Sequence, residues 1–166
     1  MEPLWCELET RAEASFFLSW IWVQTWLELT KLRPLVVVAR RSGRLAGLGL
    51  LNPAIRRRFG LRWPALSLNE AGQTGLDCIM VEDNGFLAER GFEASVASAC
   101  LRAIVRSEPD WREFRLSGIA DTEAHVTELM GLPVRVEAKR TLGDTSLPSA
   151  RPRRPQKNAG SLSRRR

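Results

Sequence analysis

Few side chains in this chain of 166 residues combine a reactive group with a position that could use it. Glu82 is the candidate for a catalytic base, because it follows the apolar run Cys78–Val81, which predicts a strand, and a carboxylate at a strand end can face a cleft. The alternative is a solvated turn over Glu82–Gly85, in which Asn84 takes the turn conformation that Asn-Gly tolerates. We favour the turn, so Glu82 stays a weak candidate and the catalytic residues are unknown.

The cysteines and the single histidine do not form a metal-binding pattern. Cys6, Cys78 and Cys100 lie far apart without a CxxC motif, and His125 would have to complete any zinc site with these scattered thiols. Cysteines in such an arrangement are typical of small buried side chains in a reducing compartment. The sequence therefore predicts a cytoplasmic protein that holds no metal ion.

One apolar stretch raises the question of a membrane segment. Ala14–Leu27 falls short of the roughly twenty residues that span a bilayer, and it contains serines and a threonine. The preceding Met1–Glu13 is acidic, whereas a secretory signal begins with a basic segment. We expect neither a membrane span nor a signal peptide.

The net charge of +6 is concentrated at the C-terminal end of the sequence. Seven of the 25 basic residues lie in 151–166 with no acidic residue among them, so residues 1–150 hold 18 basic and 19 acidic side chains. A nearly neutral body argues against nucleic-acid binding by the folded part. Nucleic acid or anionic lipid is expected as a partner only through residues 147–166, whose composition predicts a disordered basic tail.

Helical spacing of apolar residues predicts two helices in the first thirty residues. Trp5 and Leu8 share one face of the first helix, and Ser19 is a suitable N-cap for a second helix that carries Trp22 and Trp26. We expect Trp22 and Trp26 to be core anchors of a helix buried against a sheet. A stacking platform for nucleotides or sugars is the alternative.

A β-hairpin is predicted next. Pro34–Arg41 and Arg44–Leu51 are apolar runs on either side of the two-residue turn Ser42-Gly43, and we expect Asn52-Pro53 to end the second strand. The following Arg56–Arg58 reads as a solvated loop, although three arginines could also grip phosphate.

The rest of the chain alternates between strand and helix patterns. The predicted elements are a strand over Leu66–Leu68, a loop over Asn69–Gly75, a strand over Cys78–Val81, a helix over Phe92–Arg106, a strand over Trp111–Gly118, a helix from Asp121 to Gly131 and a strand over Val134–Lys139. This order predicts an α/β fold with a mixed β-sheet and covering helices.

Two glycine-containing segments qualify as phosphate-binding loops. Arg44–Gly49 matches [RQ]-x-x-G-x-[GA], the pattern with which GNAT acetyltransferases hold the pyrophosphate of acyl-CoA. Such a loop needs free amides at a helix N-terminus, whereas this match falls inside a predicted strand. Leu87–Gly91 precedes a predicted helix, but Glu89 and Glu93 would repel a pyrophosphate. We therefore expect this chain to bind acyl-CoA weakly or not at all.

The order of elements and several phrases resemble the N-terminal half of CelD-type proteins, which are bacterial acetyltransferase-like proteins named for cellulose biosynthesis and related to the Fem enzymes. The phrases are the Trp5–Leu8 helix, Phe17-Leu18-Ser19 with Trp22 and Trp26, the Val-rich strand with its Gly47-bearing return strand, Leu68–Gly72 and Val81–Leu87. The resemblance covers roughly residues 5–140 and implies a GNAT-like lobe over 1–146. It also implies acyl transfer from acetyl-CoA or another acyl-CoA to an amine or hydroxyl acceptor.

The chain departs from the pattern of that family at its C-terminal end. Residues 147–166 cannot build the second lobe, which usually carries the acyl-CoA site, so we expect a truncated or out-of-frame end, or else an authentic basic arm. The sequence also contains no Tyr, the residue that such enzymes often use to protonate the leaving thiolate. We expect an incomplete lobe, inactive alone, that awaits a second lobe and shapes an acceptor groove. The alternative is a non-enzymatic binding module whose basic tail docks on nucleic acid or anionic lipid.

Overall fold

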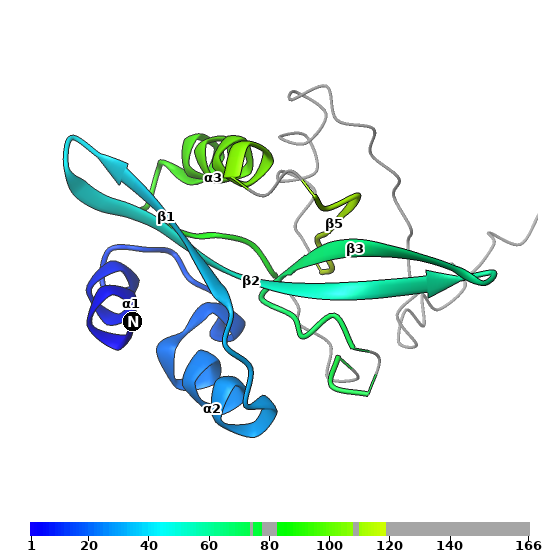
Figure 1. Ribbon diagram of the computed structural model, residues 1–166. Coiled ribbons are helices and arrows are strands. Elements are labelled where there is room, and N and C mark those ends of the chain that lie inside the picture. Colours follow the sequence, from blue (N-terminus) through cyan, green and yellow to red (C-terminus); the bar gives the residue numbers. More distant parts are fainter. Residues whose placement is uncertain (74, 78–82, 108–109, 119–166) are drawn as a thin grey trace, which may run out of the picture. The chain divides into compact units, whose positions relative to one another are not determined.

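The computed structural model describes residues 1–73, 75–77, 83–107 and 110–118 (Figure 1). The chain divides into two compact units, Met1–Val134 and Arg135–Arg166, and every described residue belongs to the first. Glu82, Cys78, His125, the strand predicted over Cys78–Val81, the last predicted helix and strand, and the basic tail lie outside the described residues.

The described part is an α/β structure. Its helices are α1 (Glu2–Glu9), the short 3₁₀ helix η1 (Phe16–Leu18), α2 (Trp20–Thr30) and α3 (Glu93–Ser107). Its strands are β1 (Leu35–Arg41), β2 (Arg44–Arg58), β3 (Leu61–Leu68), β4 (Leu87–Ala88) and β5 (Glu113–Arg115). The predicted α/β class and the helix over Phe92–Arg106 are confirmed, and Ser19 caps α2 by accepting a hydrogen bond from the Trp22 amide.

The strands form one mixed sheet in the order β1-β2-β3-β5, in which only β3 and β5 pair in parallel. The strand β2 is the longest and has two successive neighbours on one side. It pairs with β3 from Arg58 back to Leu51, and the short β4 takes over at Leu48 and Gly47. A junction between β3 and β4 therefore lies beside the middle of β2.

Two hydrophobic clusters lie on opposite faces of the sheet, because neighbouring residues of a strand point to opposite sides. Leu50 packs with α1 and α2, whereas Leu51 packs with α3. Figure 1 shows α3 on one side of the sheet and α1 and α2 on the other. The helices thus cover both faces of the part of the sheet that lies near β4.

The tryptophan that anchors the core is Trp5. Its indole is fully buried and donates a hydrogen bond of 2.8 Å to the Leu18 carbonyl. Trp26 packs against the edge of the same cluster, but Trp22 lies outside both clusters, half-buried against Phe16 and Phe17. The prediction that Trp22 is a core anchor is wrong, because its helix covers the sheet with only part of its surface.

The second strand of the first hairpin continues through the predicted breaker. Pro53 pairs with Leu66 of β3, and β2 runs on to Arg58, so the loop predicted over Arg56–Arg58 is a strand. The main chain of Leu50 bonds to Asn69 on the β3 side, so by alternation Pro53 turns its nitrogen toward β1. Because β1 begins at Leu35, opposite Leu51, the missing N–H of Pro53 removes no hydrogen bond.

Candidate functional site

The buried polar residues gather at the junction of β2, β3 and β4. Five polar side chains of the described part are buried, and they are Asn52, Ser67, Asn69, Glu70 and Asn84. Buried polar groups persist when they are hydrogen-bonded, so such a cluster fixes the positions of the segments that it joins.

Asn69 completes the pairing of Leu50 with its own side chain, where a further strand residue would otherwise supply a main-chain carbonyl. The main-chain N–H of Asn69 donates to the Leu50 carbonyl at 2.8 Å, and the side-chain oxygen of Asn69 accepts from the main-chain N–H of Leu50 at 3.0 Å. Its backbone φ of 50° is the left-handed conformation that Asn tolerates better than most residues. Asn69 therefore ends β3 while it still satisfies the main chain of β2.

Asn84 joins the same junction from the other side. Its side chain accepts a hydrogen bond from Asn69 at 2.9 Å and donates one to the Leu68 carbonyl at 2.9 Å. Asn84 is buried, so the solvated turn predicted for it is wrong, and the left-handed residue is Asp83. The sequence shows both asparagines beside apolar residues, in Leu68-Asn69 and Asn84-Gly85-Phe86-Leu87, but nothing local indicates that they contact each other.

A groove with a volume of about 400 Å³ opens beside this junction. The residues that line it are Glu13, Ala14, Ser15, Leu18, Asp83, Asn84, Gly85, Phe86, Leu87, Ala88 and Glu93. The hydroxyl of Ser15 donates to the Asp83 carbonyl at 3.2 Å and ties the two walls together. Among the lining residues that the structure describes, three carry carboxylates and none carries a cationic side chain.

The loop between β4 and α3, the best placed for a phosphate, uses its amides within the chain. The amides of Glu89, Arg90 and Phe92 donate to main-chain carbonyls, and the amide of Gly91 donates to the Glu93 carboxylate at 2.9 Å. A pyrophosphate would have to displace these bonds and approach the carboxylate of Glu93. The residues of this loop do not fit acyl-CoA.

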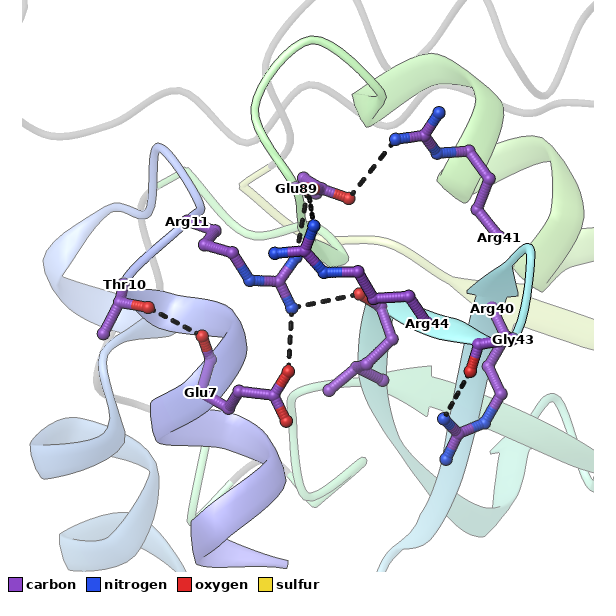
Figure 2. A network of polar contacts seen from close by, with 9 residues as sticks. Glu7, Thr10, Arg11, Arg40, Arg41, Gly43, Arg44 and Glu89 are labelled. Carbon is purple, nitrogen blue, oxygen red and sulfur yellow. Dashed lines mark hydrogen bonds and ion pairs between the residues drawn. The ribbon is translucent and has the colours of Figure 1, made fainter.

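Figure 2 shows that Glu89 is also surrounded by arginines. Arg11 approaches its carboxylate at 3.0 Å, Arg41 at 3.9 Å and Arg44 at 4.0 Å. Arg41 additionally lies over the Phe92 ring, 3.8 Å from its centroid. The exposed fraction of the Glu89 side chain is only 14%, so the pairing with Arg11 holds α1, the first hairpin and the start of α3 together.

The other phosphate-loop match, Arg44–Gly49, lies in β2 as predicted. Gly47 pairs with Ala39 of β1 on one side and with Ala88 of β4 on the other. A Cβ atom at Gly47 would lie 2.2 Å from a methyl group of Val96 in α3. Close packing of α3 on the sheet, and not an anion, therefore accounts for this glycine.

The remaining reactive side chains do not assemble. Cys100 is buried in the α3 cluster, and burial raises the pKa of its thiol to about 12. Cys6 is half-buried in α1, and both are free thiols. Within the described residues no group of three His, Cys, Asp or Glu side chains is placed to hold a metal ion. No described helix combines the length and apolar content needed to cross a membrane.

The chain was compared with protein families, curated proteins and solved structures. No family model, no curated protein and no solved structure matches this chain. The likeness to CelD-type proteins rests on the sequence phrases alone, of which Leu68–Gly72 and residues 83–87 meet at the asparagine junction.

Proposed function

We propose that this chain is an acyltransferase-like lobe of the CelD type, and that its groove receives the amine group of an acceptor. The support is the sequence resemblance together with an α/β arrangement in which helices cover a mixed sheet. In that family an acyl group passes from acyl-CoA to an amine or hydroxyl. The loop at Glu89–Phe92 does not fit acyl-CoA, so the acyl donor would have to be held by a second lobe.

The observation that carries the acceptor assignment is the charge of the groove. Three of its lining residues, Glu13, Asp83 and Glu93, carry carboxylates, and Asn84 forms part of its wall. Among the described residues, Glu13 pairs with Arg90 at 3.8 Å, and both side chains are exposed. An ammonium group entering the groove would gain charge-assisted hydrogen bonds, whereas a phosphate would be repelled.

Titration calorimetry on the full chain with spermidine and with acetyl-CoA tests this proposal. We expect salt-sensitive binding of spermidine, weakened several-fold by Glu13→Gln combined with Asp83→Asn, because each substitution removes one charge from the groove. Glu28→Gln, an exposed carboxylate on α2 outside the groove, is the matched control and should leave binding unchanged. Equal effects of the two sets would show that spermidine binds the surface at large. Micromolar binding of acetyl-CoA would refute the proposal that the donor site lies elsewhere.

The alternative function, a binding module with a basic tail, makes a separate prediction. If the seven cations of residues 151–166 contact seven phosphates, the log–log salt dependence of DNA binding has a slope of about −6. Deleting residues 151–166 should then abolish binding. An unchanged slope after deletion would place the nucleic-acid contacts on the body.

A further inference from the structure

The far ends of β2 and β3 form a two-stranded ribbon that extends beyond the helices (Figure 1). At its tip Phe59 is 90% exposed and Leu61 is 69% exposed, and Ile55, further back along the ribbon, is 56% exposed. Large apolar side chains gathered at such exposure mark interaction sites, whereas single ones are ordinary.

The turn at the tip places Phe59 in an unfavourable conformation. Phe59 and Gly60 form the two-residue loop between Arg58 and Leu61, with φ angles of 50° and 79°. Two positive φ angles define a type I′ turn, whose first position favours Asn, Asp or Gly. The Phe59 ring is almost fully exposed, and its ring contact is with the Arg58 guanidinium, 5.2 Å from the ring centroid, so packing against the core does not account for a Phe here.

Two arginines behind the tip place like charges close together. Arg57 and Arg62 face each other directly across the strand pair, on the same side of the ribbon, and both are exposed. No described carboxylate pairs with either, whereas the neighbouring Arg56 lies 4.0 Å from Glu113. Like charges directly opposite destabilise a hairpin, and an anionic partner would reverse that effect.

We propose that this tip docks on a bilayer that contains anionic phospholipid. Strand residues advance by about 3.3 Å each, so Arg57 and Arg62 stand about 7 Å behind the turn. That spacing lets the Phe59 ring enter the apolar boundary, which lies about 5–10 Å deep, while the guanidinium groups remain at the phosphates.

The layout of the tip favours lipid over nucleic acid. The outermost residue is apolar and the cations lie behind it, as an interface with an apolar interior requires. The phosphates of a nucleic acid are its outermost charges, and they would be met by cations at the extremity of the protein. Ile55 and Leu61 also lie on opposite faces of the ribbon, so apolar groups surround the tip rather than facing one groove.

Vesicle co-sedimentation of the full chain tests the proposal. The probes are vesicles of phosphatidylcholine with phosphatidylglycerol and vesicles of phosphatidylcholine alone. Phe59→Asn should lower partitioning onto the anionic vesicles about tenfold, because a buried Phe side chain contributes at least that factor. Leu29→Gln, which removes an apolar side chain of α2 that is 73% exposed, should have no effect. Arg57→Gln and Arg62→Gln should each lower partitioning about fivefold, and Arg33→Gln should lower it less.

The choice of Asn keeps the test separate from folding. Asn suits the turn better than Phe, so the thermal midpoint of Phe59→Asn should be equal or higher while its vesicle binding falls. The basic tail is the same in every variant and contributes equally to each measurement. Unchanged partitioning of Phe59→Asn would overturn the proposal. A loss of affinity for a DNA duplex without loss of vesicle binding would overturn it in favour of nucleic acid.

Discussion

The two hairpins of this sheet end in the same turn, yet their surroundings differ. Ser42-Gly43 and Phe59-Gly60 have the same pair of φ angles, 50° and 79°. Each turn is flanked by three arginines, which are Arg40, Arg41 and Arg44 at the first turn and Arg57, Arg58 and Arg62 at the second. At the first turn the Glu89 carboxylate and the Phe92 ring, both from the loop between β4 and α3, contact two of the arginines. At the second turn the aromatic residue, Phe59, is one of the two turn residues.

The comparison shows that the same turn geometry occurs in two different electrostatic surroundings, according to what packs beside it. Around Ser42-Gly43 the carboxylate of Glu89 offsets part of the positive charge, and its pairing with Arg11 helps to hold elements together. Around Phe59-Gly60 the Arg57–Arg62 pair raises the free energy of the folded chain unless a partner is present. A charge run is therefore informative about function only when its counter-charges are known.

The largest effect is expected at the first hairpin. Glu89→Gln removes the carboxylate that Arg11 contacts, in a pair whose side chains are only 14% and 19% exposed. Arg11 keeps its contacts with Glu7 and the Leu45 carbonyl but loses its least exposed charged partner, which should lower the free energy of unfolding by about 2 kcal/mol. Urea denaturation followed by tryptophan fluorescence measures it. A loss of less than about 1 kcal/mol would mean that solvent screens the network and that the two hairpin ends are alike.

A smaller loss is expected from the carboxylate nearest the second hairpin. Glu113 accepts a hydrogen bond of 2.6 Å from the Trp63 indole and lies 4.0 Å from Arg56, but it is half-exposed. Glu113→Gln should cost about 1 kcal/mol, since a hydrogen bond to a charged group is weakened and little else changes. The same denaturation experiment applies. A cost equal to that of Glu89→Gln would contradict the view that only the first hairpin is held by its counter-charge.

The sequence predicts the first hairpin and misses the second for identifiable reasons. Ser42-Gly43 lies between two apolar runs, so local pattern suffices. Pro53 suggests an end to β2. Only the structure shows that β1 begins at Leu35, so that Pro53 has no β1 residue opposite it and removes no hydrogen bond. In Phe59-Gly60 only the glycine is a residue type typical of turns, so the local pattern does not indicate a turn there.

The candidate site was predicted less well than the fold. Asn69 and Asn84 form a contact fifteen residues apart in sequence, set by where β3 leaves β2, and no local pattern encodes that point. That Glu89 and Glu93 would repel a phosphate was a prediction from charge alone. The arginines that surround Glu89 weaken this argument for Glu89, and they could not be predicted, because Arg11 comes from a segment far from Glu89 in the sequence.

Replacing the turn residue should stabilise the second hairpin. Phe59→Asn exchanges a bulky residue at a φ of 50° for one that tolerates this conformation, so the free energy of unfolding should rise by about 1 kcal/mol. Ser42→Asn at the equivalent position of the first hairpin should gain less, because Ser is smaller and already common in turns. Thermal denaturation compares the two. A destabilised Phe59→Asn variant would show that the ring packs on the ribbon despite its exposure.

The smallest effect concerns the facing arginines, and a double-mutant cycle isolates it. Arg57→Gln and Arg62→Gln should each stabilise the chain by a few tenths of a kcal/mol, because each removes the same repulsion between directly opposite like charges. The double variant should then gain little over either single one, since the repulsion is already gone after the first substitution. High salt should erase the gain, because both side chains are exposed and screening acts fully on them. Strictly additive gains, or gains that persist in high salt, would mean that the two arginines do not act on each other. The second hairpin would then be no more strained electrostatically than the first.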